Sequence, residues 1–137
     1  MCIHSFVNTK DSSLVIRAGD NTFLWTSRNC RRMGLSFMVL QYVGPLALSD
    51  RFRYSVTLRT ADKIQALTEW ENTQSYLKVP YEAMKQEKCP QFFNSYIDLC
   101  LDSTNTLEVE VNARYLRLQE KPDIHVEPST AGASSSK

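Results

Sequence analysis

The sequence lacks the signals that usually identify a zinc site, a secreted protein or a membrane protein. None of its four cysteines forms a Cys-x-x-Cys pair, and no Asn-x-Ser/Thr glycosylation acceptor occurs. Residues 1–10 do not resemble a signal peptide, and every apolar run is far shorter than the roughly 20 residues that span a membrane. We therefore expect a reduced, soluble protein that resides in the cytoplasm or also in the nucleus.

The sequence also lacks an excess of positive or negative charge. Sixteen Lys and Arg residues face 15 Asp and Glu residues, which gives a formal net charge of +1. Strong non-specific binding of nucleic acid needs a concentrated positive field, and this composition does not supply one. We expect neither nucleic acid nor a membrane as a partner.

Side chains suited to catalysis or metal binding are few. The two histidines, His4 and His125, lie outside the confident strands, and Cys2 has no further ligand near His4 in the sequence. Glu108 and Glu110 could form a carboxylate pair, but their strand face is opposite the apolar one and is better explained as solvated. No cofactor, metal site or catalytic residue is predicted.

A basic segment, SRNCRR at 27–32, follows Trp25. Its arginines could bind a phosphate or an acidic peptide, although a solvated loop is the simpler interpretation. Trp25 could be a binding anchor, although a tryptophan in this position is more often a partly buried core residue.

The clearest hydrophobic periodicity is two. Apolar and polar residues alternate along 51–60 and 106–115, which predicts strands with one buried face. The segment 34–43 is apolar on both faces and predicts a central strand buried on both sides. Shorter strands are predicted at 14–17, 22–26, 64–70, 75–79 and 95–101, and one short helix at 81–88 after Pro80. These patterns predict an all-β fold, an antiparallel sandwich of seven to eight strands with one short helix.

The chain divides into two parts. Residues 1–118 carry the hydrophobic pattern and form the predicted domain, whereas 119–137 are predicted to be a disordered tail. Within the tail, the stretch KPDIHVEPST places Ile124 and Val126 in alternation between two prolines, Pro122 and Pro128.

Four segments together resemble a known family. They are WTSRNCRRMGLSFMVL (25–40), RFRYSVTLRTADKIQALTEW (51–70), NSYIDLCLD (94–102) and LEVEVNA (107–113). They are similar, with gaps over about 14–115, to the substrate-binding domain of the seven-in-absentia (Siah) ubiquitin ligases. The resemblance implies a TRAF-like sandwich that dimerises, with itself or with full-length Siah-type ligases.

The resemblance also implies a function. Such a domain captures degron-bearing protein substrates by pairing an extended Pro-x-Ala-x-Val-x-Pro segment with a sheet edge, for ubiquitin-dependent degradation. Trp25 corresponds by position to a residue of the peptide groove. Phe23 and Leu24 correspond more loosely, and Glu110 replaces an asparagine of the family.

The sequence departs from the family in having no RING or zinc finger, which require closely spaced Cys and His ligands. At most it would be the non-catalytic part of a RING-type ligase, unable to ligate ubiquitin alone. Two other interpretations stay open: a generic TRAF-like adaptor, and a β-barrel that encloses a small molecule.

The family's degron also resembles the tail of this chain. Pro122, Val126 and Pro128 match its Pro, Val and Pro, while Ile124 replaces its alanine and is a poor fit for a pocket sized for a methyl group. The tail is therefore predicted to be a solvated linker, with a pseudo-ligand as the alternative.

Overall fold

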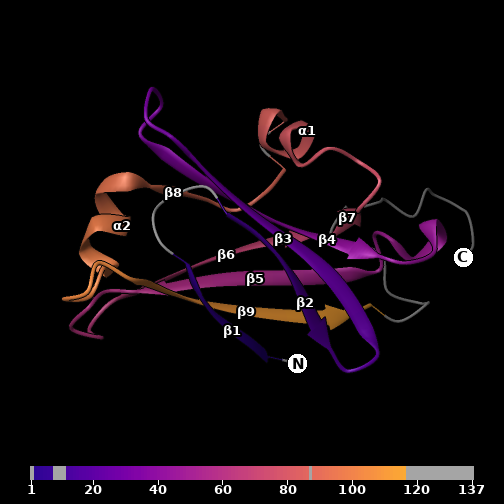
Figure 1. The fold of residues 1–137 in the computed structure, drawn as a ribbon, viewed down its shortest axis with the longest axis horizontal. Coiled ribbons are helices and arrows are strands. Elements are labelled where there is room, and N and C mark those ends of the chain that lie inside the picture. Colours follow the sequence, from indigo (N-terminus) through magenta and orange to yellow (C-terminus); the bar gives the residue numbers. More distant parts are fainter. Residues whose placement is uncertain (1, 8–11, 87, 117–137) are drawn as a thin grey trace, which may run out of the picture.

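Two β-sheets packed face to face make up the computed structural model, which describes residues 2–7, 12–86 and 88–116 (Figure 1). Sheet I has the strand order β1 (Cys2–Val7), β9 (Leu107–Tyr115), β5 (Phe52–Arg59) and β6 (Ala66–Asn72). Sheet II has the order β2 (Ser12–Ala18), β3 (Asn21–Cys30), β4 (Leu35–Val43) and β7 (Gln74–Ser75), and β8 (Gln91–Phe93) also pairs with β4. Three short helices complete the described chain: η1 (Leu46–Leu48), α1 (Pro80–Lys85) and α2 (Asn94–Cys100). The prediction of an all-β sandwich is confirmed.

The two strands with the clearest alternation form the middle of sheet I. β5 and β9 pair antiparallel, with Val56 opposite Val111. Every second residue on each strand points into the sandwich and is buried, while the residues between them face outward. The strands predicted at 51–60 and 106–115 are therefore confirmed.

Aromatic side chains fill the space between the sheets. The ring of Phe23 lies 5.2 Å from that of Phe52, which in turn stacks on Tyr42 at 5.0 Å. Trp25 and Tyr54 are among the largest fully buried side chains. Because this interior is occupied by packed side chains and the sheets stay separate, the fold is a filled sandwich rather than a ligand-enclosing barrel.

β4 is buried on both of its faces, as its apolar sequence predicts. Met38 and Leu40 face sheet I, whereas Phe37 and Val39 point outward and pack against Met84 of α1 and its neighbours. Pro80 occupies the first turn of this helix, where a missing N–H costs nothing. The helix predicted at 81–88 is confirmed, although it has six residues and ends at Lys85.

Two predicted strands are wrong. The segment 95–101 forms α2, because Ile97 and Cys100 lie three residues apart and together bury one helical face against the core. Of 75–79, only Ser75 belongs to a strand, β7. Residues 76–79 form a turn instead, because the side-chain amide of Gln41 donates hydrogen bonds to the carbonyls of Ser75 and Lys78 at 3.1 and 2.7 Å.

The strands β1 and β8 were not predicted from the sequence. The tail, with Pro122, Ile124, Val126 and Pro128, lies outside the described residues. Within the described ranges, no helix has the length and apolar character needed to cross a bilayer.

Candidate peptide-binding edge and groove

The four residues predicted to line a peptide groove do not share one surface. Phe23 and Trp25 point inward from β3 and are completely buried between the sheets. Leu24 lies between them on the outer face of sheet II, whereas Glu110 lies on the outer face of sheet I. Strand alternation explains the separation, because residues 23 and 25 share the core side. Neither Phe23 nor Trp25 is accessible to a peptide in this structure, so the interpretation of Trp25 as core is the one that holds.

Trp25 instead lies on the core side of sheet II, on the strand next to the edge strand β2. It is opposite Leu14 of β2 in the β2–β3 register, and its indole Nε1 is buried without a hydrogen-bond partner among the described residues. The packed aromatic side chain holds β3 in place, and β3 in turn holds β2. The contribution of Trp25 to any site on β2 is therefore indirect.

β2 has an open edge. Among the described strands it pairs with β3 alone, from Ser12 opposite Ser27 to Ala18 opposite Asn21. The strand contains neither proline nor lysine, and its one charged residue, the exposed Arg17, lies near its end, whereas Val15 at its centre is apolar and 64% exposed. β1, the edge strand of sheet I, lies beside it (Figure 1).

The other edges are less suited to pairing. β4 is covered on its far side by β7 and β8, which pair with its two ends. β6, at the edge of sheet I, carries Glu69 and Glu71, and such charges discourage pairing with an added strand. Of the edges with described side chains, β2 is the one best prepared to accept a peptide strand.

Glu110 belongs to an ion-paired surface. Its carboxylate pairs with the guanidinium of Arg59 and accepts a hydrogen bond from the Asn112 amide at 3.2 Å. Its neighbour Glu108 binds the ammonium of Lys63 at 3.2 Å. Each carboxylate has its own cation, so the interpretation of this face as solvated fits better than a catalytic carboxylate pair.

The buried thiols are poorly reactive. Burial raises the pKa of Cys89 to about 12, and it also raises the pKa of Cys100. Both side chains therefore stay protonated at neutral pH, and a protonated thiol is neither a nucleophile nor a metal ligand. In the part of the chain that the structure describes, no three His, Cys, Asp or Glu side chains gather as metal ligands.

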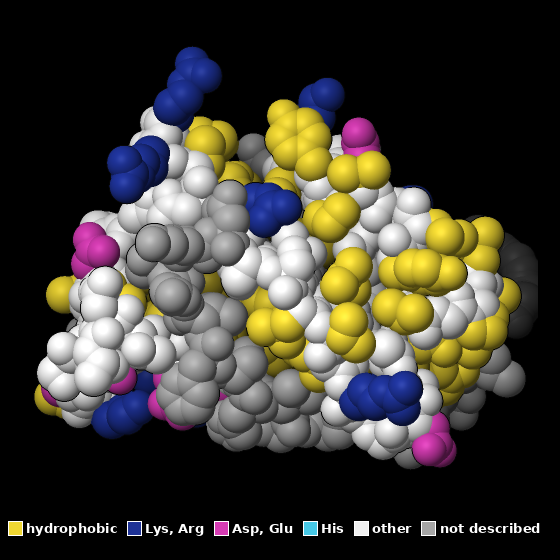
Figure 2. Space-filling view, viewed as in Figure 1, with side chains coloured by type: hydrophobic (Ala, Val, Ile, Leu, Met, Phe, Trp, Pro, Cys, Tyr) yellow, Lys and Arg dark blue, Asp and Glu magenta, His cyan; other side chains and the backbone are white. Residues whose placement is uncertain are grey.

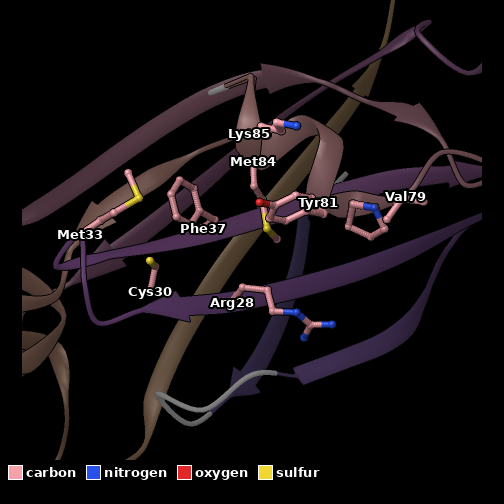
Figure 3. A pocket seen from close by; sticks show the side chains of 9 residues that line it. Arg28, Cys30, Met33, Phe37, Val79, Tyr81, Met84 and Lys85 are labelled. Carbon is pink, nitrogen blue, oxygen red and sulfur yellow. The ribbon is translucent and has the colours of Figure 1, made fainter.

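A groove of about 460 Å³ opens on the outer face of sheet II, between α1 and the hairpin that joins β3 to β4 (Figure 3). We call it the α1 groove. Its lining is Arg28, Cys30, Met33, Phe37, Val79, Pro80, Tyr81, Met84 and Lys85. Sequence reasoning missed this groove, although the basic segment 27–32 and the apolar segment 76–84 together form most of it.

No family model matches the chain, and no curated protein matches it either. The Siah resemblance stays a prediction.

Proposed function

We propose that the chain is a protein-interaction module of the Siah type, which captures extended peptides by strand addition in ubiquitin-dependent protein degradation. The observation that carries this proposal is the open edge of β2. A seven-residue edge without proline or lysine can offer alternate backbone N–H and C=O groups to a peptide.

The surroundings of β2 favour strand addition over a loose surface contact. Its inward residues, Ile16 and Ala18, are anchored in the core, so the strand is ordered before a peptide arrives. Ser13, Val15 and Arg17 alternate with them and are exposed, so they can contact alternate side chains of an added strand. A rigid edge lowers the entropic cost of binding.

The resemblance supplies the proposed ligand and the cellular role. A peptide of the pattern Pro-x-Ala-x-Val-x-Pro is the ligand that the family captures. In this proposal the module acts as a receptor that presents substrates to a full-length partner ligase, or competes with that ligase for them.

Fluorescence anisotropy with a labelled Pro-x-Ala-x-Val-x-Pro peptide and the full chain tests the proposal. We expect saturable binding in the micromolar range. Two further peptides carry N-methyl groups on alternate amides, one set in each phase. Only one phase places its N–H groups toward β2, so we expect one methylated peptide to lose at least about tenfold in affinity and the other to bind normally.

A scrambled peptide is the control. Equal binding of both methylated peptides would exclude strand addition while leaving a side-chain-mediated interaction. Absence of saturable binding by the degron peptide would refute the Siah-type assignment, and the generic adaptor would then be the better interpretation.

A further inference from the structure

We propose that the α1 groove is a second docking site, which binds an acidic segment of a partner protein through bulky apolar side chains. This proposal is independent of the β2 edge, because the groove lies on the outer face of β3 and β4 and is lined by different residues.

Exposed apolar side chains on both sides of the groove are the first argument. Met33 at the hairpin turn is 56% exposed, and Val79 and Tyr81 at the start of α1 are 61% and 62% exposed. Between them lie Phe37 and Met84, and the methionines can adapt their shape to a ligand (Figure 3). A volume of about 460 Å³ is large enough to receive two or three large side chains.

The apolar surface continues beyond the groove, which favours a peptide over a small molecule. Tyr76 and Leu77, just before the groove-lining segment, are 42% and 67% exposed. In Figure 2 hydrophobic side chains gather in neighbouring patches over the upper and right-hand part of the view. Exposed apolar side chains that gather on one part of a folded domain favour a protein-interaction site.

Charge identifies the partner's chemistry. Arg28 enters the lining from β3 and Lys85 enters it from α1, on opposite sides of the groove, and none of the lining residues is acidic (Figure 3). The adjoining turn adds Arg31 and Arg32, both exposed. Carboxylates that flank the apolar anchors of a peptide would meet a cation on either side, which steers association and selects acidic segments.

The test uses the full chain and fluorescein-labelled octapeptides. The acidic probe is Glu-Asp-Leu-Phe-Asp-Leu-Glu-Asp. A second probe replaces every acid with Lys, and a third replaces Leu and Phe with Ser. We expect saturable binding of the acidic probe, and at least tenfold weaker binding of the other two.

Matched variants place the binding in the groove. Lys85→Glu should weaken the acidic probe roughly fivefold, whereas Lys88→Glu, with the same charge change three residues away and outside the lining, should change binding less than twofold. Met33→Asp should weaken binding at least tenfold, and circular dichroism checks that each variant is folded. Unchanged binding in both Lys85→Glu and Met33→Asp, or no saturable binding of the acidic probe, would overturn the proposal.

Two other occupants give distinct results that would also overturn it. If the groove binds a second copy of the chain, Met33→Asp should convert a dimer to a monomer in sedimentation. If the chain's own tail fills it, the acidic probe should bind only after Ile124→Asp and Val126→Asp are introduced together.

Discussion

The outer faces of the two sheets differ sharply. On sheet I, β5 turns Ser55 and Thr57 outward among arginines, and the face is closed by side-chain hydrogen bonds and ion pairs. On sheet II, β4 turns Phe37 and Val39 outward beneath a helix. With the same strand geometry, the outer face of sheet I is polar and can face the solvent. The outer face of sheet II is apolar and has to be covered by a further layer of structure.

The second layer on sheet II is incomplete. α1 has six residues, about 9 Å of helix, whereas the nine residues of β4 extend about 30 Å. The helix covers Val39 well, but the end of the strand near Phe37 borders the α1 groove. The short helix therefore explains why an apolar groove opens beside it on the outer face of sheet II.

The largest expected effect on stability comes from replacing one of the two tryptophans, Trp25, and not the other, Trp70. Trp25→Ala on sheet II should lower the free energy of unfolding by about 3–5 kcal/mol, because it leaves a cavity in the centre of the core. Trp70→Ala on the outer face of sheet I should lower it by no more than about 1 kcal/mol. Trp70 is half exposed and stacks with the Arg53 guanidinium at 5.3 Å. Urea unfolding of the purified variants measures both, and similar losses would contradict the burial difference.

Exchanging polar and apolar residues on the two outer faces should have a smaller effect. Val39→Thr puts a hydroxyl beneath α1 and should cost about 1–3 kcal/mol of unfolding free energy. The reverse exchange, Thr57→Val, removes one hydrogen bond with Thr68 at 2.7 Å and should cost about 1 kcal/mol or less.

The same urea unfolding series compares the two variants. If Thr57→Val lost more unfolding free energy than Val39→Thr, the expectation that α1 buries Val39 of β4 would be contradicted.

The sequence predicted the elements whose pattern is local. Alternation identified β5 and β9, the doubly apolar 34–43 identified β4, and Pro80 identified the start of the helix that covers it. The segment 95–101 was predicted as a strand but forms α2, because burial of Ile97 and Cys100 against the core and a bond from Tyr96 favour the helix there. The Tyr96 hydroxyl donates to the carbonyl of Leu58 at 3.1 Å, and no local pattern announces that bond.

The candidate sites were harder to predict. Trp25 next to a basic loop has the same sequence whether it anchors a ligand or the core, and only the register of β3 in the sandwich decides between the two. The α1 groove joins residues 28–37 to residues 79–85, about 50 positions apart, so neither segment shows it alone. Edge strands pose the same problem, because the openness of β2 depends on which strands pair elsewhere.

A third prediction concerns alkaline pH and a buried thiol on the outer face of sheet II. Burial against the outer face of β4, beside Phe37 and Met84, raises the pKa of Cys89 to about 12, above the roughly 8.5 of an unfolded thiol. The folded state therefore holds this proton more tightly. The stabilisation is complete below pH 8.5 and is lost as pH rises toward 12, by at most about 1.4 kcal/mol per pH unit. Cys89→Ala should flatten this decline between pH 9 and 11 in urea titrations, and an identical slope would contradict the burial of the thiol.

The smallest effect should come from the ion pairs on sheet I. Lys63 and Glu108 are both well exposed, with 3.2 Å between the ammonium and the carboxylate, so Lys63→Ala should lower the unfolding free energy by about 0.2–1 kcal/mol. Lys63 also has a positive φ of 66°, which glycine adopts without strain. Lys63→Gly should therefore be at least as stable as Lys63→Ala although it loses the same ion pair. In 1 M NaCl the difference between wild type and Lys63→Ala should shrink, because salt screens an exposed pair, whereas the loss in Trp25→Ala should persist. If the unfolding free energy lost in Lys63→Ala did not depend on salt, the contribution of Lys63 would come from packing. The outer faces of the two sheets would then be stabilised in a similar way.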